Sequence, residues 1–121
     1  MQYNKVGETM YKIMIVEDDE VIACAVQQSL VSWGMDAFCV QDFSSVLAEF
    51  AVKNPQLVLM DIHLPFFNGF HWCQEIRKVS KVPVIFLSSA SDNMNIIMAV
   101  NMGGDDFIAK PFDLSVLTAK V

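Results

Sequence analysis

The stretch Lys12-Ile13-Met14-Ile15-Val16-Glu17-Asp18-Asp19 changes abruptly from an apolar run to a run of acids. Consecutive apolar and β-branched side chains are typical of a strand that is buried on both faces, as in parallel sheets. Asp19 has the side chain of a helix N-cap, and apolar residues follow it at helical spacing. The stretch therefore predicts a buried strand over 12–16 that leads into a helix.

The same alternation of apolar strand and helical segment continues along the chain. The core-facing stripe of the first helix is expected to hold Ile22, Val26, Ser29 and Trp33. Further strands are expected at 35–40, 57–61, 83–87 and 106–109, with helices after Asp42, over 70–78, after Asp92 and after Asp113. Five such units without internal repeats predict an α/β fold, a three-layer doubly wound parallel sheet with right-handed crossovers.

Composition sets limits on the class of protein. The 121 residues are 54% hydrophobic, enough for one compact domain and too few for two. A net charge of −6 argues against electrostatic binding of nucleic acid by this piece, because phosphate neutralisation needs clustered Lys and Arg. Cys24, Cys39 and Cys73 fit no metal-ligand spacing and lie in apolar stretches, so we expect reduced core thiols in a cytoplasmic protein. The sequence displays no signal peptide or membrane span.

Polar groups recur at the downstream ends of the apolar runs. Glu17-Asp18-Asp19 follows the first run, and Asp61, Ser88 and Lys110 follow or end three later ones. Because the carboxyl ends of parallel strands meet at one edge of a sheet, where open α/β sheets bind ligands, these groups should lie together. Clustered carboxylates beside a lysine and a hydroxyl suit Mg²⁺ and a phosphoryl group. The pattern predicts a site for phosphoryl transfer.

Each of these groups also has a purely structural explanation. Acids at the start of a helix cap it and complement its dipole, which suffices for Asp19 and Glu20. A single Asp or Ser after a strand often satisfies backbone groups, and Lys-Pro is a common exposed turn. Only their joint occurrence favours a site. We expect His63 and His71 to be solvated or half-buried side chains, and Trp72 to be a packing residue.

The combined motifs closely resemble the receiver domain of two-component response regulators over residues 10–121. The short connection between 78 and 83 is similar to the OmpR/PhoB-like branch of that family, and segments 70–73 and 86–89 resemble its regulators that respond to bacitracin and antimicrobial peptides. The resemblance implies a flavodoxin-like and CheY-like form of the three-layer fold. The motifs that carry it are Val16-Glu17-Asp18, Asp61-Ile62-His63-Leu64-Pro65 with Gly69, Ser88, and Asp105-Asp106-Phe107-Ile108-Ala109-Lys110-Pro111-Phe112.

The resemblance implies that Asp61 is the phosphoacceptor. Its carboxylate would attack the phosphorus of a phosphohistidine on a sensor histidine kinase and form an acyl phosphate. Lys110 would pair with one phosphoryl oxygen and stabilise the charge that spreads during transfer, and Ser88 would donate its hydroxyl to another.

A Mg²⁺ cofactor is expected in the same place. Glu17, Asp18 and Asp61 would repel one another, so a cation must neutralise them, and an oxygen-rich site with ample water suits Mg²⁺. Asp18 and Asp61 would be direct ligands. The resemblance adds the backbone carbonyl of His63 as a third protein ligand, with Glu17 acting through water.

In the family, phosphorylation is read by a two-state switch. The hydroxyl at the Ser88 position moves toward the phosphoryl group, and an aromatic at the Phe107 position turns inward behind it. Phe107 replaces the tyrosine that is commoner in this branch, so its rotation would rest on packing alone.

The face that dimerises in this branch is expected to be more apolar here. A basic and an acidic residue usually oppose each other across it, and the matching positions are Ile96 and Val116. The alternative is that Ile96 packs into its own core. The expected interface comprises Ile96, Ile97, Val100, Asp105, Asp106, Val116 and Lys120.

The function implied by the resemblance is a phosphorylation-dependent switch, not an enzyme, that dimerises to position a DNA-binding domain for transcription regulation. We expect residues 1–9 to be an N-terminal extension or vector remainder, and 10–121 to be the receiver, ending inside its last helix, so that DNA is contacted only by an output domain absent here. No membrane contact is expected.

Three other classes of protein are alternatives to a receiver. An aspartyl phosphatase would carry an Asp-x-Asp motif after the first strand, which the acidic run does not supply in context. A flavin or nucleotide module would need a phosphate-cradling loop where the acids stand. A phosphate-independent receiver-like interaction module is the stronger alternative.

Overall fold

The computed structural model describes residues 11–89 and 106–110, with the backbone alone for residues 88, 89, 106, 107, 109 and 110. Its strands form one parallel sheet in the order β2-β1-β3-β4-β5, the order of flavodoxin-like folds. The strands are β1 Lys12–Val16, β2 Asp36–Cys39, β3 Leu57–Asp61, β4 Val84–Ser89 and β5 Asp106–Lys110. The predicted doubly wound sheet is confirmed.

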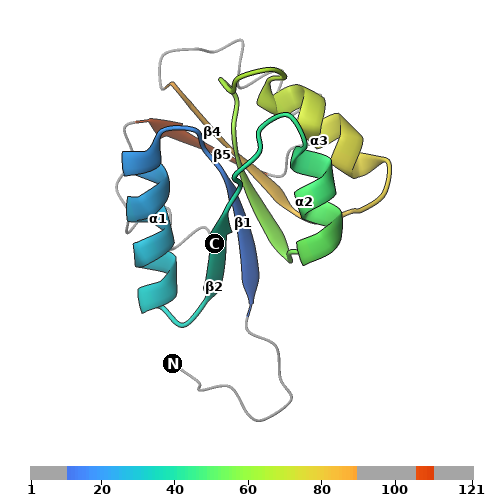
Figure 1. The fold of residues 1–121 in the computed structure, drawn as a ribbon. Coiled ribbons are helices and arrows are strands. Elements are labelled where there is room, and N and C mark those ends of the chain that lie inside the picture. The colour runs from blue at the N-terminus through green and yellow to red at the C-terminus, as the bar shows by residue number, and fades with distance from the viewer. Residues whose placement is uncertain (1–10, 90–105, 111–121) are drawn as a thin grey trace.

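Helices cover both faces of this sheet. Helix α1 (Glu20–Ser32) lies on one face, and α2 (Val46–Lys53) and α3 (Gly69–Arg77) lie on the other (Figure 1). Successive strand residues alternate between the two cores: Ile13 and Ile15 pack on the α1 side, whereas Met14 and Val16 pack on the α2 and α3 side. All four are fully buried. Burying each such side chain contributes about 1.5–3 kcal/mol to folding, so the hydrophobic strands hold the carboxyl edge in place.

The buried stripe of α1 differs from the predicted one. Val26 is buried as expected, but the stripe continues through Ala23 and Leu30, and Trp33 is 62% exposed. The helix ends at Ser32, so Trp33 stands at the C-cap, just before the chain turns through Gly34 at a φ of 84°. A residue beyond the last helical turn does not follow the helical spacing, which is why the stripe prediction was wrong there.

Of the two predicted N-caps in the described segments, one is confirmed and one is wrong. The Asp19 carboxylate accepts hydrogen bonds from the backbone N–H groups of Val21 and Ile22 and caps α1. Asp42 instead closes a turn by accepting from the N–H and hydroxyl of Ser44, and these hydrogen bonds hold the pKa of its carboxyl below the ordinary value. The N-cap of α2 is Ser45.

Candidate functional site

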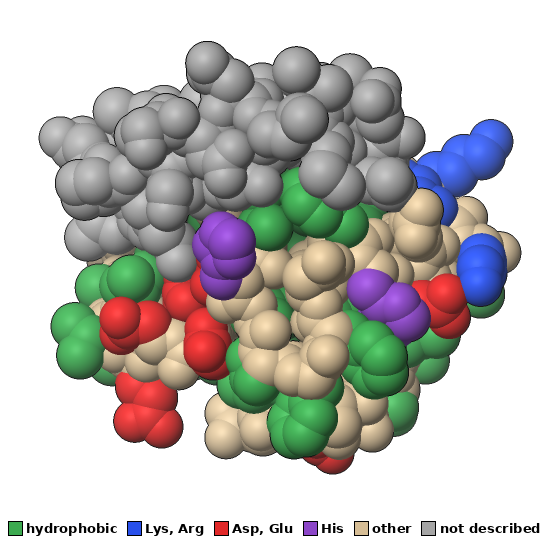
Figure 2. Space-filling view, turned by 90° about the horizontal axis from the view of Figure 1, so that it is seen from above, with side chains coloured by type: hydrophobic (Ala, Val, Ile, Leu, Met, Phe, Trp, Pro, Cys, Tyr) green, Lys and Arg blue, Asp and Glu red, His purple; other side chains and the backbone are tan. Residues whose placement is uncertain are grey.

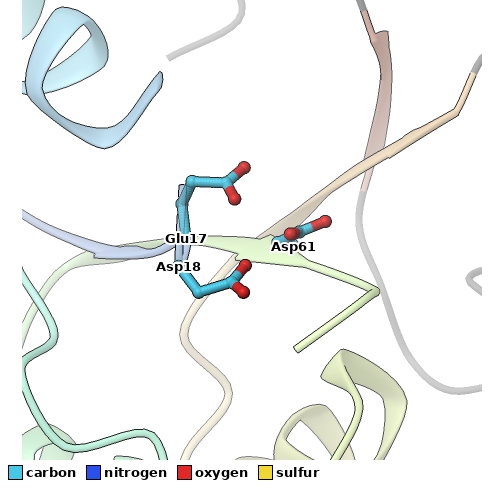
Figure 3. Close-up of side chains that lie close together, drawn as sticks. All are labelled: Glu17, Asp18 and Asp61. Carbon is cyan, nitrogen blue, oxygen red and sulfur yellow. The ribbon is translucent and has the colours of Figure 1, made fainter. Parts of the chain in front are cut away.

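Three carboxylates meet at the carboxyl edge of the sheet. Glu17 and Asp18 follow the end of β1, and Asp61 is the last residue of β3, the strand next to β1. One oxygen from each side chain lies within 4.8 Å of the other two, and Figure 3 shows the three side chains at this junction. Seen from above this edge, acidic side chains gather on one part of the surface (Figure 2). The convergence predicted from the sequence is present.

The three acids differ in exposure. Glu17 and Asp61 are each 3% exposed, whereas Asp18 is open to solvent. Glu17 is held by the fold, because its Oε2 accepts from the backbone N–H of Asp19 at 3.1 Å. The cluster thus has two fixed carboxylates and one at the surface.

The backbone around Asp61 is fixed on both sides. The N–H of Ile62 donates to the Leu87 carbonyl of β4 at 3.2 Å, and the N–H of Gly69 donates back to the Ile62 carbonyl at 2.9 Å. The Asp61 Oδ1 accepts from the backbone N–H of His63 at 3.4 Å. These bonds tie the end of β3, the following loop and the start of α3 into one unit that orients Asp61.

The site is compatible with Mg²⁺ on the chemistry of its donors. All three groups are carboxylates, the hard oxygen ligands that this ion prefers, and the exposed side of Asp18 leaves room for the waters that Mg²⁺ retains. The His63 side chain is exposed, as predicted for a solvated histidine.

Ser88 and Lys110 reach the same edge through the sheet register. Asp61 pairs with Leu87, so Ser88 is one residue further along β4, and Ser89 pairs with Lys110 of β5. Adjacent strands lie about 4.8 Å apart, which puts the Lys110 backbone roughly 10 Å from that of β3. The sheet thus carries the backbone of Ser88 and Lys110 to the edge that holds Asp61.

The predicted switch and dimer residues are described only in part. Phe107 and Asp106 belong to β5, and only their backbone is described. The other interface predictions lie outside the described residues: Ile96, Ile97, Val100, Asp105, Val116 and Lys120.

An aromatic group beside the site was not anticipated. Phe66, in the loop after β3, adopts a φ of 69° and is 76% exposed. Phe67 stacks on His71 with ring centroids 4.3 Å apart and meets Trp72 edge-on at 5.6 Å. A left-handed φ is rare for a bulky residue, so no local sequence signal could have indicated it. Trp72 is buried, as predicted for a packing residue.

Comparison with known proteins now decides the family. A model of the response regulator receiver domain matches residues 13–121. The chain belongs to this family. It is the receiver domain of a two-component response regulator, a signalling module, and its relatives include transcriptional regulatory proteins.

Individual relatives and solved structures support this assignment. The chain is 46% identical to the sensory transduction protein BceR of Bacillus subtilis (strain 168) over 112 residues, 93% of this chain and 48% of BceR. The N-terminal domain of the lantibiotic response regulator NsrR is 50% identical, with a TM-score of 0.83 and coverage of 90% and 92% of the two chains. The BeF3-activated receiver domain of Klebsiella pneumoniae RstA is 32% identical, with a TM-score of 0.85 and coverage of 90% and 93%.

The receiver spans about half the length of the curated relatives it matches. Among the described helices, none has the length and apolar character needed to cross a membrane.

Proposed function

We propose that Asp61 is the phosphoacceptor of this receiver. A carboxylate oxygen of Asp61 attacks phosphorus, the bond from phosphorus to the kinase histidine breaks, and its electron pair returns to the imidazole ring. The product is an acyl phosphate on Asp61. The observation that carries the proposal is the fixed position of this carboxylate at the strand edge, with two more acids within 4.8 Å.

Asp18 and Asp61, the backbone carbonyl of His63 and, through water, Glu17 would hold Mg²⁺. The ion supplies positive charge that offsets the acids and the incoming phosphoryl group. The chain itself supplies orientation: Glu17 is held by the Asp19 N–H, and Asp61 by the backbone unit around Ile62. A pre-oriented nucleophile lowers the entropic cost of transfer.

Lys110 and Ser88 are proposed to bind two phosphoryl oxygens, with Ser88 and Phe107 forming the switch. Support comes from the register, which sets β4 beside β3 and β5 beside β4 and carries the backbone of both residues to the edge that holds Asp61. A cationic and a hydroxyl donor at that edge would stabilise charge on the equatorial oxygens during transfer.

The output is proposed to be dimerisation that positions a DNA-binding domain of the longer protein for transcription regulation. Names such as lantibiotic response regulator for NsrR support an input from antimicrobial peptides through a sensor kinase. The cytoplasmic location expected from the sequence stays a prediction.

Phosphoacceptor identity is tested by intact mass after incubation with Mg²⁺ and a small acyl-phosphate donor. The wild type is expected to gain one phosphoryl group, and Asp61→Asn none. Asp36→Asn, a carboxylate change at the opposite edge of the sheet, is the matched control and should be labelled like the wild type. Labelling of Asp61→Asn would refute the assignment, and an unlabelled wild type would favour a phosphate-independent interaction module.

Dimerisation is tested by sedimentation with and without beryllofluoride. Ile96→Glu should weaken the activated dimer by roughly 2 kcal/mol or more, because an unpaired charge would be buried at a two-fold interface. A dimer of unchanged strength in this variant would place the interface elsewhere.

A further inference from the structure

Two cysteines line one hollow beside the acidic cluster. The hollow has a volume of about 270 Å³ and lies between α1 and the end of β2, with Cys24 and Cys39 on its wall and Glu17 and Asp18 at its edge. The sequence predicted core thiols, but only Cys73 is buried. Cys24 is exposed and Cys39 is half-buried. The prediction was wrong for Cys24 because the buried stripe of α1 runs through its neighbour Ala23.

Two hydrogen bonds join α1 to β2, and Cys24 lies between the two α1 residues that make them. The Cys39 thiol donates to the carbonyl of Ala23, the residue before Cys24, with the sulfur 3.8 Å from the oxygen. One helical turn along, the Gln27 amide donates to the Ala37 carbonyl at 2.9 Å. The contacts hold the segment of α1 that bears Cys24 directly against the end of β2 that bears Cys39.

We propose that Cys24 and Cys39 form a redox-modifiable dithiol that a peroxide converts to an intramolecular disulfide between α1 and β2. Disulfides in reducing compartments are typically transient and redox-sensing, which suits a pair with one solvent-exposed member. Cys73, buried in the core on the opposite face of the sheet, has no part in it.

The two thiols have different roles in the reaction. Burial and the neighbouring charge of Cys24 raise the pKa of Cys39, so Cys39 stays protonated longer. Cys24 is exposed, and its sulfur accepts a hydrogen bond from the Gln28 amide at 3.5 Å. The Cys24 thiolate therefore attacks the peroxide first.

The chemistry balances with hydrogen peroxide as the oxidant. The Cys24 thiolate attacks one peroxide oxygen, the O–O bond breaks, and protonation yields Cys24 sulfenic acid and one water. The Cys39 sulfur then attacks the Cys24 sulfur, the S–O bond breaks, and a second water leaves. Two thiols have lost two electrons and two protons, and the peroxide has been reduced to two waters.

Among the described residues that line the hollow, the charged side chains are the acids Glu17, Asp18 and Glu20. The proposed disulfide is independent of the proposed phosphorylation, because its formation is measured as the oxidation of Cys24 and Cys39.

The test is limited oxidation of the wild type by hydrogen peroxide, followed by thiol blocking, intact mass and peptide mapping. We expect the loss of two hydrogen atoms, a cross-linked pair of peptides holding Cys24 and Cys39, and full reversal by dithiothreitol. Cys73→Ser is the matched control and should cross-link as the wild type does. Neither Cys24→Ser nor Cys39→Ser should form the cross-link. Because Cys24 is exposed, Cys24→Ser is expected to fold like the wild type.

Two results would overturn the proposal. One is oxidation of Cys24 to sulfinic acid in the wild type while Cys39 remains a free thiol. That result would mean that the Cys39 sulfur cannot reach the Cys24 sulfenic acid. The other is a disulfide only between two copies of the chain through Cys24. A rise in the urea midpoint of the oxidised wild type, absent in Cys39→Ser, would support an intramolecular link between α1 and β2.

Discussion

Gly69 lies against the backbone of Asp61 so closely that any side chain would overlap it. A Cβ built at Gly69 would collide with the Asp61 carbonyl oxygen and approach Met60 Cγ to 3.0 Å. The glycine N–H also donates to the Ile62 carbonyl at 2.9 Å. The first residue of α3 is therefore part of what orients the acid at the end of β3.

Gly69→Ala should reduce both stability and phosphorylation. The methyl group must displace the Asp61 backbone or shift the start of α3, and such overpacking costs about 1–3 kcal/mol of unfolding free energy. Urea unfolding measures the first effect and acyl-phosphate labelling the second.

Gly34→Ala provides the matched control for that variant. Gly34 has a φ of 84° and lies at the opposite edge of the sheet, so alanine there strains the backbone by about 1–2 kcal/mol without touching Asp61. Its labelling should be normal once folded. If Gly69→Ala were labelled as fast as Gly34→Ala, the close contact would have no role in the site.

Asp18→Asn should stabilise the metal-free domain. Removing one charge from three carboxylates within 4.8 Å relieves repulsion on the order of 1 kcal/mol at high effective dielectric. Mg²⁺ should raise the urea midpoint of the wild type and have little effect on the variant. Asp36→Asn, at the far edge, should respond to Mg²⁺ like the wild type. An unchanged Mg²⁺ response in Asp18→Asn would remove Asp18 from the ligand set.

Asp19→Ala should cost about 1 kcal/mol of unfolding free energy, because two N–H groups at the start of α1 lose their acceptor. Glu20→Ala is the comparison, since that acid lies in the first turn but caps nothing. Urea unfolding at fixed pH separates the two. Equal effects would mean that the contribution of Asp19 is its charge near the helix dipole.

The Asp42 turn should show a defined pH dependence. The hydrogen bonds from Ser44 lower the pKa of the Asp42 carboxyl, so the turn is favoured above the ordinary carboxyl pKa near 3.9 and the benefit is lost as pH falls through the lower folded value. Carboxyl NMR titration should place the midpoint of the wild type below that of Ser44→Ala. Identical midpoints would contradict the assignment.

Strand positions were largely predictable from the sequence because strands buried on both faces read as unbroken apolar runs. The expected spans over 12–16 and 57–61 agree with β1 and β3 residue for residue. The start of α2 could not be predicted from the sequence, because Asp42 and Ser45 are both good N-cap residues. What separates them is Glu49, whose carboxylate accepts from the Gln41 and Asp42 N–H groups and so keeps that segment outside the helix.

The acids of the site could be predicted for a similar reason. The carboxyl ends of parallel strands meet at one edge of the sheet, and each acid stands at or just after such an end. That placement brings together Glu17, Asp18 and Asp61. The contact of Gly69 with Asp61 and the left-handed φ of Phe66 could not be predicted, because both depend on how the loop after β3 folds back onto the sheet.

Trp72, not Trp33, should report changes at the site by fluorescence. Trp72 is 6% exposed, meets Phe67 edge-on and lies one turn beyond Gly69, whereas Trp33 is 62% exposed at the far end of α1. The Trp72 indole N–H makes no hydrogen bond among the described residues, so small shifts of the loop after β3 should change the surroundings of this ring. A Mg²⁺-dependent emission change should persist in Trp33→Phe and vanish in Trp72→Phe. The reverse pattern would show that the change is transmitted along α1 instead.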